Sequence, residues 1–418
     1  MKTMTTSERL IYKTYTASFS LQKVPDAQIK KMLLQLAAAI EKNAPQLIKA
    51  NKKDLSRQDK DNPKNDRLLL NEDRIENIAA SIRQISKLPN PSGKILERKI
   101  LYNGLALQKV SAPLGVVGAI YESRPNVTFD IAALCLRSKN ASVLKGSRDA
   151  EYSNKAAVRL IKKVLVQSNI PADCVALMPS DREAVKDMFI AEKYIDVIIP
   201  RGSDELIQYV RRNSLVPVIE TGAGVCHTYV EKDADLQKAV DIVVNAKTTR
   251  PSVCNSLDSL LIDQSIAKSF LQKLLPEFEK FGVELFADSK VYGLIKNYPF
   301  KQKASPSDFA REFLSLKCAL KTVKNYEEAI EHIRKYSTRH SEAIVSNNKK
   351  LCERFLEEVD SATVYSNAST RFTDGGEFGL GAEIGISTQK LHARGPFALE
   401  KLVTEKWVIR GKGQVRKN

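Results

Sequence analysis

The chain has 418 residues, of which 43% are hydrophobic and 28% are charged, a composition typical of folded proteins and not of disordered ones. Lysine and arginine number 66 against 49 aspartate and glutamate residues, so the net charge is +17. The basic residues are interleaved with acidic ones and form no stripe with aromatic side chains, which argues against nucleic-acid binding. Such a surface suits ligands that carry phosphate or carboxylate groups.

No apolar run approaches the roughly 20 residues that cross a bilayer, and residues 1–23 lack the continuous apolar segment of a secretory signal. We therefore expect a soluble, cytoplasmic protein that does not bind membranes. The cysteines are scattered, with no CxxC pair and no short-spaced cluster with histidines, so the sequence predicts neither a disulfide scaffold nor a metal site. They are Cys135, Cys174, Cys226, Cys254, Cys318 and Cys352.

The first part of the chain is predicted to be helical. Apolar residues recur at helical spacing over residues 26–55 and again over 72–88. The pattern then changes, because Asn103-Gly104 stands between two apolar segments within residues 99–110. An Asn-Gly pair in this setting is typical of a β-hairpin, so we expect a projecting ribbon here.

Short β-branched runs then alternate with helical stretches at intervals of about twenty to thirty residues, which is typical of βαβ units in a parallel sheet. We therefore predict an α/β protein with two parallel-sheet domains and Cys254 between them, where clefts form. The tail at 406–411 is again strand-like, and we expect it to pair with another strand, on this subunit or another. The predicted strands are 116–121, 141–144, 175–178, 196–199 and 218–219, followed by 260–262, 343–345 and 363–365.

Cys254 is the strongest candidate for a nucleophile. It follows Pro251, and proline favours the first helical position, where amide groups and the helix dipole stabilise an anion. We therefore predict that Cys254 lies just inside a helical turn that favours its thiolate. Cys226 beside His227 is a weaker candidate, because neighbours on a strand point to opposite faces. The other cysteines are expected to pack in apolar segments.

The usual nucleotide-binding signals are absent, since the sequence contains neither GxGxxG nor a Walker A phosphate loop. The remaining candidate is the strand end at 198–203. There Gly202 and Ser203 lead into a predicted helix whose amide groups can meet a phosphate or a ribose.

Several longer blocks occur along almost the whole chain: PLGVVG at 113–118, YESRPNVT at 121–128, RPSVCN at 250–255, ASTRFTDGGEFG at 368–379 and KLHARGP at 390–396. Together they resemble the γ-glutamyl phosphate reductase branch of the aldehyde dehydrogenase superfamily. The chain begins without a kinase domain, so we expect the free-standing form of the reductase and not the fused one.

The resemblance implies an aldehyde dehydrogenase-like fold whose cofactor domain lacks GxGxxG. It implies an NADP-binding domain at 1–96 and 112–222, a catalytic domain at 223–404, and a small β oligomerisation ribbon at 97–111 and 405–418. The partner is then a second copy of the chain, in a homodimer or a dimer-based oligomer.

The implied reaction is NADPH-dependent reduction of L-γ-glutamyl 5-phosphate to L-glutamate 5-semialdehyde and phosphate in proline biosynthesis, with a functional link to glutamate 5-kinase. Cys254 would attack the acyl phosphate, and the resulting thioester would accept hydride. Asn126 matches the oxyanion donor of the superfamily. Glu220 matches the glutamate that activates water in oxidising members, although a water-activating base would waste a thioester that must survive until it is reduced.

The resemblance also assigns binding residues. Lys145 and Ser147 are implied to hold the adenosine ribose of NADP, Gly202 and Ser203 lie under the nicotinamide, and Glu312 holds the nicotinamide ribose. For the acyl phosphate and the α-carboxylate we expect arginine forks, which bind such oxygens in a bidentate way. These are Arg250, Arg371 and Arg394.

Two alternative functions stay open. The first is an aldehyde dehydrogenase that oxidises a free aldehyde by hydrolysis of the thioester, which Glu220 favours. The second is a basic nucleic-acid-binding protein with no catalytic role, which the lack of a concentrated basic patch opposes.

Overall fold

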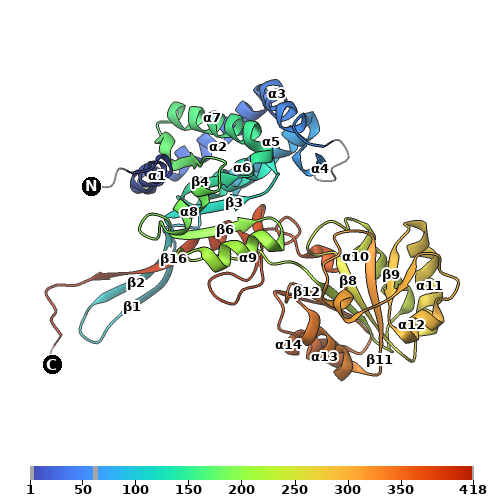
Figure 1. Cartoon of the computed structure of the whole chain (residues 1–418). Coiled ribbons are helices and arrows are strands. Elements are labelled where there is room, and N and C mark those ends of the chain that lie inside the picture. Colours follow the sequence, from blue (N-terminus) through green and yellow to red (C-terminus); the bar gives the residue numbers. More distant parts are fainter. Residues whose placement is uncertain (1–3, 60–64, 417–418) are drawn as a thin grey trace. The chain divides into compact units, whose positions relative to one another are not determined.

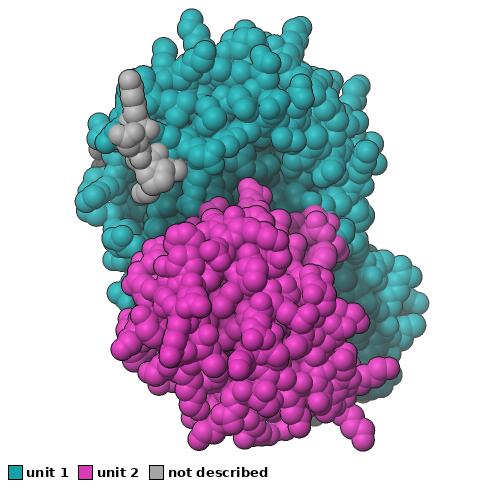
Figure 2. All heavy atoms as spheres, turned by 90° about the vertical axis from the view of Figure 1, so that its right-hand side faces the viewer, with its two compact units in different colours: residues 1–221, 379–385, 397–418 teal, residues 222–378, 386–396 magenta. Residues whose placement is uncertain are grey.

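A computed structural model of the chain describes residues 4–59 and 65–416. These residues form two compact units, which Figure 2 colours teal and magenta. Unit 1 comprises the described residues up to 221 with 379–385 and 397–416, and unit 2 comprises 222–378 with 386–396. The segments 379–385 and 397–404 therefore belong to unit 1, whereas the resemblance implied a domain 223–404 that includes them.

Unit 1 opens with the predicted helices. Pro45 near the start of the third helix separates it from the second, because proline suits the first turn and lacks the N–H that a continuous helix would need. The first helix was missed, since half of its buried positions are polar (Ser7, Thr14 and Ser18) and the apolar periodicity is weak. The helices are α1 (Thr6–Gln22), α2 (Asp26–Lys42), α3 (Ala44–Leu55), α4 (Asn65–Leu68) and α5 (Glu72–Lys87).

The parallel sheet of unit 1 has the strand order β5-β4-β3-β6. Its strands occur where the sequence predicted them, except that 218–219 forms only an isolated bridge from Val218 to Ile198. β3 and β4 are buried on both faces, which explains their continuous apolar runs. The strands are β3 (Val116–Tyr121), β4 (Ala141–Gly146), β5 (Val175–Leu177) and β6 (Val197–Arg201), and the helices between and after them are α6 (Pro125–Arg137), α7 (Glu151–Gln167), α8 (Glu183–Phe189) and α9 (Asp204–Asn213).

The predicted hairpin is confirmed. β1 (Ile95–Ile100) and β2 (Ala106–Pro113) pair antiparallel, and Gly104 in their connection has φ +81°. The tail strand β16 (Val403–Arg410) pairs with β2 of the same chain, from Val403 opposite Pro113 to Arg410 opposite Ala106. In Figure 1 this ribbon extends away from the helices of unit 1.

Unit 2 contains a second parallel sheet, with the strand order β10-β9-β11-β8-β7-β12-β13. The sequence predicted β8, β12 and β13 and placed Cys226 and His227 on a strand, but it missed β9, β10 and β11, some of which are short or carry polar residues. The strands are β7 (Cys226–Val230), β8 (Leu257–Asp263), β9 (Glu284–Ala287), β10 (Lys301–Lys303), β11 (Lys317–Val323), β12 (Ser341–Val345) and β13 (Thr363–Ser366). The helices are α10 (Leu236–Thr248), α11 (Ala267–Lys280), α12 (Ser289–Leu294), α13 (Tyr326–Tyr336) and α14 (Lys349–Glu358), and a separate pair of strands comprises β14 (Glu383–Ser387) and β15 (Gly395–Ala398).

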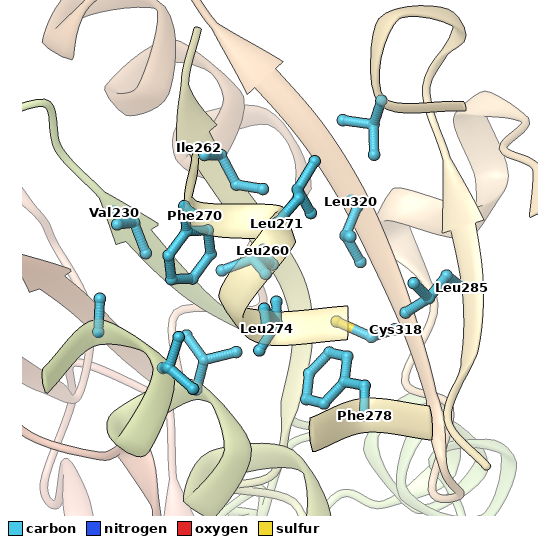
Figure 3. Close-up of a cluster of buried hydrophobic side chains, with 14 of the residues drawn as sticks. Val230, Leu260, Ile262, Phe270, Leu271, Leu274, Phe278, Leu285, Cys318 and Leu320 are labelled. Atoms are coloured by element: carbon cyan, nitrogen blue, oxygen red, sulfur yellow. The ribbon is translucent and has the colours of Figure 1, made fainter. Parts of the chain in front are cut away.

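The core of unit 2 follows the two-residue period of its strands. Leu260 and Ile262 of β8 pack with Phe270 and Phe278 of α11, as Figure 3 shows. Leu261 between them belongs to the cluster on the other face of the sheet, with residues of α13 and α14. Two buried layers thus fix the sheet from both sides, and each buried large side chain contributes about 1.5–3 kcal/mol. Among the described residues, no helix is long and apolar enough to cross a lipid bilayer.

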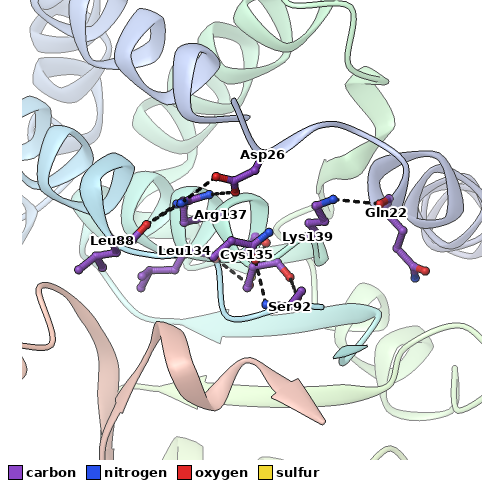
Figure 4. A network of polar contacts seen from close by, with 10 residues as sticks. Gln22, Asp26, Leu88, Ser92, Leu134, Cys135, Arg137 and Lys139 are labelled. Atoms are coloured by element: carbon purple, nitrogen blue, oxygen red, sulfur yellow. Dashed lines mark hydrogen bonds and ion pairs between the residues drawn. The ribbon is translucent and has the colours of Figure 1, made fainter. Parts of the chain in front are cut away.

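The buried side chain of Arg137, drawn in Figure 4, links three helices of unit 1. Arg137 at the end of α6 is 2% exposed, and its Nε and Nη2 donate to the carbonyl oxygen of Leu88 at 2.9 and 2.6 Å. Its guanidinium also pairs with Asp26 at the start of α2. The hydrogen bond and charge of Arg137 hold the pKa of Asp26 below its ordinary value. One side chain therefore connects α2, α5 and α6.

Arg137→Met should lower the free energy of unfolding by about 1–3 kcal/mol, because methionine leaves the Leu88 carbonyl without its donors. The matched control is Arg83→Met, whose exposed ion pair with Glu41 should contribute little, because solvent screens it. The stabilisation that comes from the pairing of Arg137 with Asp26 is fully present above the ordinary aspartate pKa of 3.8. It is lost as the pH falls through the lowered pKa of Asp26. Urea unfolding followed by circular dichroism measures both variants; equal losses would contradict the role given to Arg137.

Candidate active site

Cys254 lies in a series of turns between α10 and β8. Residues 249–256 contain no helix, and the backbone N–H of Ser256 donates to the carbonyl of Val253 at 3.0 Å. The predicted helical turn at Cys254 is therefore wrong, because α10 ends at Thr248 and β8 begins at Leu257, which leaves room only for turns. No helix dipole acts on this thiol from its own segment, so its ionisation must depend on neighbouring side chains.

Gly224 fixes the backbone of Cys254 from the side of β7. A Cβ atom at Gly224 would lie 1.7 Å from the carbonyl oxygen of Cys254, so only glycine permits this approach. The N–H of Gly224 donates to Oε1 of Glu312 at 2.9 Å. Glu312, one of the predicted cofactor residues, is thereby held next to the Cys254 turn. Sequence reasoning missed this role of Gly224, because close approach between distant segments leaves no local signal.

Arg371 lies beside Cys254 and carries the positive charge of this region. Burial lowers its pKa first, and the nearby charge of Arg250 lowers it further, whereas Asp374 and Cys254 raise it. Its Nε is buried and has no hydrogen-bond partner among the described residues. Arg371 thus interacts both with the Cys254 thiol and with the charge of Arg250, and an anion bound at Arg371 would relieve the repulsion between the two guanidinium groups.

Arg394, the third predicted arginine, is engaged elsewhere in unit 2. Its Nη1 lies 2.7 Å from Oδ1 of Asp360, and its Nη2 donates to the Asp360 carbonyl at 2.9 Å. The hydrogen bonds of Lys390 and, next, of Arg394 lower the pKa of the Asp360 carboxyl to about 2. The structure therefore groups Arg250 and Arg371 with Cys254 and gives Arg394 a carboxylate partner.

Cys226 lies behind Cys254 and does not compete with it as a nucleophile. Its Sγ donates to the carbonyl oxygen of Cys254 at 3.2 Å, and burial raises its pKa well above the ordinary value, with Glu342 adding to the effect. His227 contacts a different group, since its Nδ1 lies 3.0 Å from Oε2 of Glu342. The two neighbours therefore have different partners, and the pairing of β7 with β8 is irregular between them.

Asn126 occupies the first turn of α6, which begins directly after β3. Its Nδ2 donates to Oδ2 of Asp130 at 3.1 Å, and an amide NH2 group carries a second donor. Burial raises the pKa of Asp130 to about 6, against a smaller opposing effect of the Asn126 hydrogen bond. The carboxyl end of β3 thus presents an amide whose orientation is set by one carboxyl group.

Lys145 lies at the carboxyl end of β4 and is only 7% exposed. Its Nζ donates to the carbonyls of Gly146 and Ser180 at 3.2 and 3.3 Å. Burial lowers its pKa, and Asp181 partly opposes this. Ser147 caps the short helix that follows by accepting a hydrogen bond from the Asp149 N–H at 3.0 Å. Lys145 therefore offers a buried ammonium at a ligand-binding edge, and Ser147 has a structural role.

Gly202 and Ser203 lead into α9, as the sequence predicted, but their groups face a carboxylate. The Oγ and backbone N–H of Ser203 donate to Glu122 at 2.8 and 3.1 Å, and a Cβ at Gly202 would lie 2.7 Å from the Glu122 carboxyl carbon. The Ser203 donors that were expected to meet a phosphate or ribose are thus used by Glu122. Sequence reasoning missed Glu122, whose contact with Ser203 spans two βα loops.

Glu220 lies on the segment that runs beside β6. Its Oε1 forms an ion pair with Nε of Arg211 at 3.0 Å, and its side chain is 14% exposed. This pair holds the carboxylate in place within unit 1.

The chain matches the model of the aldehyde dehydrogenase family over residues 2–296. It is similar to the γ-glutamyl phosphate reductase of Chlorobium phaeobacteroides (strain BS1), with 54% identity over 97% of both chains. The γ-glutamyl phosphate reductase of Bacteroides fragilis (strain YCH46) is 49% identical over 95% of this chain and 96% of its own. The crystal structure of γ-glutamyl phosphate reductase from Thermotoga maritima superposes with a TM-score of 0.94 at 41% identity, covering 98% of this chain and 99% of that one.

The chain belongs to the aldehyde dehydrogenase family. Its predicted fold class, two parallel-sheet α/β units with a β ribbon, is that of the γ-glutamyl phosphate reductase structure. The family uses NAD(P) as cofactor. A dinucleotide site is therefore expected in this chain although its sequence lacks GxGxxG. Lys145 fits such a cofactor, because the hydrogen bonds that its buried ammonium donates among the described residues go only to backbone carbonyls, and the charge of Asp181 helps to keep it protonated.

Iodoacetamide should label Cys254 before any other cysteine, because it is partly exposed whereas the other five are buried. Cys254→Ser should slow the initial labelling by roughly tenfold or more. Cys226→Ser is the matched control and should leave the initial rate unchanged. Peptide mapping after brief labelling measures the outcome, and loss of early labelling in Cys226→Ser would reverse the assignment.

Proposed function

We propose that this chain catalyses the NADPH-dependent reduction of L-γ-glutamyl 5-phosphate to L-glutamate 5-semialdehyde and phosphate in proline biosynthesis. The observation that carries the proposal is the partly exposed Cys254 beside Arg371 and Arg250. A thiol can attack an acyl phosphate, and two guanidinium groups suit the phosphate that departs. The names of relatives that are 49–54% identical over nearly the whole chain support the same substrate.

Cys254 begins the reaction as its thiolate. The sulfur forms a bond to the acyl carbon, and the carbon–oxygen bond to phosphate breaks, so phosphate leaves with the electron pair and a thioester remains. Arg371 and Arg250 favour the thiolate before the attack and the phosphate dianion after it. We assign Asn126 as a donor to the carbonyl oxygen, on which negative charge develops. Arg394 remains a candidate for the α-carboxylate.

Lys145 and Glu312 are the residues that we assign to the cofactor. When bound, NADPH supplies the hydride that reduces the thioester to the aldehyde and frees the Cys254 sulfur. The ammonium of Lys145 suits the ribose hydroxyls and the 2′-phosphate that distinguishes NADPH from NADH. The donors of Ser203 would join this site only if Glu122 released them. All six cysteines are free, which suits a reducing compartment and supports a cytoplasmic location.

The second candidate function is oxidation of a free aldehyde with hydrolysis of the thioester. Glu220 is the residue that favours it, since a carboxylate can activate water. The Arg371 and Arg250 pair favours the reductase, because hydrolysis by water requires no anion site beside the thiol.

The reverse reaction separates these functions. With glutamate 5-semialdehyde and NADP, the formation of NADPH should require added phosphate, because phosphate must release the acyl group. Arg371→Gln should raise the KM for phosphate about 10- to 100-fold, since hydrogen bonds to charged groups contribute ~1.5–3 kcal/mol. Arg354→Gln is the matched control, as Arg354 pairs with Glu327 and Glu358 on the surface of unit 2. Sustained turnover without phosphate, with free glutamate as product, would establish the hydrolytic function.

We also propose that the ribbon of β1, β2 and β16 joins two copies of the chain. It exposes apolar side chains that a monomer would leave in water: Ile100 is 76% exposed, Tyr102 100% and Trp407 53%. An unpaired edge strand such as β1 is a ready template for another chain. The link to glutamate 5-kinase follows from the reactive acyl phosphate, which an enzyme that phosphorylates the γ-carboxylate of glutamate must supply.

Ile100→Asp should weaken self-association, because it places a charge in the proposed apolar interface. Val166→Asp on α7 is the matched control, since Val166 is 61% exposed in the same unit but lies outside the ribbon. Sedimentation at several concentrations measures both variants. A wild-type chain that sediments as a monomer, or an oligomer unaffected by Ile100→Asp, would refute this interface.

A further inference from the structure

We propose that Asn255 is a positioning residue that holds the guanidinium of Arg371 beside Cys254 without neutralising its charge. The inference rests on the proposed function and adds the residue that sets the geometry of the phosphate-binding cation. Asn255 was not among the predicted site residues, although it directly follows the nucleophile.

The side chain of Asn255 is fully engaged with one segment. Asn255 is 3% exposed, and its Nδ2 donates to the carbonyls of Arg371 and Thr373 at 3.2 and 2.9 Å. Its Oδ1 accepts a hydrogen bond from Nη1 of Arg371. The backbone carbonyl of Asn255 accepts from Oγ1 of Thr370 at 2.7 Å. The turn that carries Cys254 is thus joined to residues 370–373 by both main chain and side chain.

Residues 370–373 are in turn fixed to the sheet of unit 2. The hydroxyl of Thr373 lies 2.7 Å from the hydroxyl of Ser341 on β12 and 2.8 Å from that of Tyr365 on β13. Asn255 therefore connects the nucleophile turn to a rigid frame, and the position of Arg371 is defined relative to Cys254.

The charges around Arg371 explain why an acceptor is needed. Arg250 repels its guanidinium, and Asp374 and Glu377 attract it. Asn255 supplies the neutral hydrogen-bond acceptor that fixes the guanidinium at the turn that carries the thiol. Glu312, held by Gly224 on the other side of the Cys254 turn, adds a negative charge to the region. An amide oxygen is neutral, so it orients Arg371 and leaves its full charge for the thiolate and the phosphate.

The variants Asn255→Ala and Asn255→Asp separate positioning from packing. Asn255→Ala should raise the KM for phosphate in the reverse reaction by about tenfold, because the cation loses its acceptor. Asn255→Asp keeps the size and the acceptor, but it neutralises Arg371 and loses the two donors to the carbonyls of Arg371 and Thr373, so we expect a loss at least as large. In an Arg371→Gln background, Asn255→Ala should add no further loss, because the two residues act as one unit.

The pH dependence of Cys254 alkylation by iodoacetamide provides a readout that needs no assumption about substrate. Both variants should shift the midpoint upward by ~1 pH unit, since the thiolate loses the field of a well-placed cation. Thr370→Val is the matched control: it removes a hydrogen bond between the same segments without touching the guanidinium. It should reduce thermal stability but leave the midpoint and the KM for phosphate unchanged.

The outcomes distinguish this inference from the proposed function. If the wild type turns over without phosphate, the proposed function fails, and the alkylation midpoint still decides on Asn255. If the wild type needs phosphate and folded Asn255 variants keep both the wild-type KM for phosphate and the wild-type alkylation midpoint, the positioning role is refuted. A loss in Thr370→Val equal to that in Asn255→Ala would reduce Asn255 to a structural residue.

Discussion

The positive charge beside the Cys254 thiol is the interaction on which this account depends. Cys254 does not lie at a helix N-terminus, so the backbone of its own segment provides no dipole to stabilise a thiolate. The half-buried guanidinium of Arg371 supplies the positive charge instead. Its pKa is lowered, because burial and the nearby charge of Arg250 disfavour its charged form. This unfavourable arrangement is relieved by a negative charge, first on the sulfur and then on the departing phosphate.

The rest of unit 2 maintains that arrangement. Gly224 allows the backbone of Cys254 to approach β7, Asn255 connects the turn to residues 370–373, and Thr373 anchors that segment to β12 and β13. The parallel sheet provides the rigidity, because its strands are buried between two layers of helices. Substitutions at Gly224 or Asn255 are therefore expected to lower the reactivity of Cys254 by moving its thiol relative to the Arg371 guanidinium. Neither residue acts as a nucleophile or a base.

The sequence predicted much of the fold because its strongest signals are local. The continuous apolar run at 116–121 predicted a buried strand, and Asn103-Gly104 predicted a hairpin. Both predictions are confirmed, by β3 and by the pairing of β1 with β2. The helical turn at Cys254 was wrong, because Pro251 favours a helix start but cannot reveal that only a short connection separates α10 from β8. Glu122 at Ser203 and Gly224 at Cys254 were missed because they act through contacts between segments far apart in the chain. Membership of the aldehyde dehydrogenase family was recognised from long sequence blocks, whereas the residue roles implied by those blocks remain proposals.

The most direct test of the central claim is to trap the acyl group. The enzyme is mixed with glutamate 5-semialdehyde and NADP in the absence of phosphate, and the protein is then digested and mapped by mass spectrometry. We predict a single turnover of NADPH formation, a γ-glutamyl group on Cys254, and its discharge when phosphate is added. An acyl group on another residue, or continued turnover with release of free glutamate, would contradict the account.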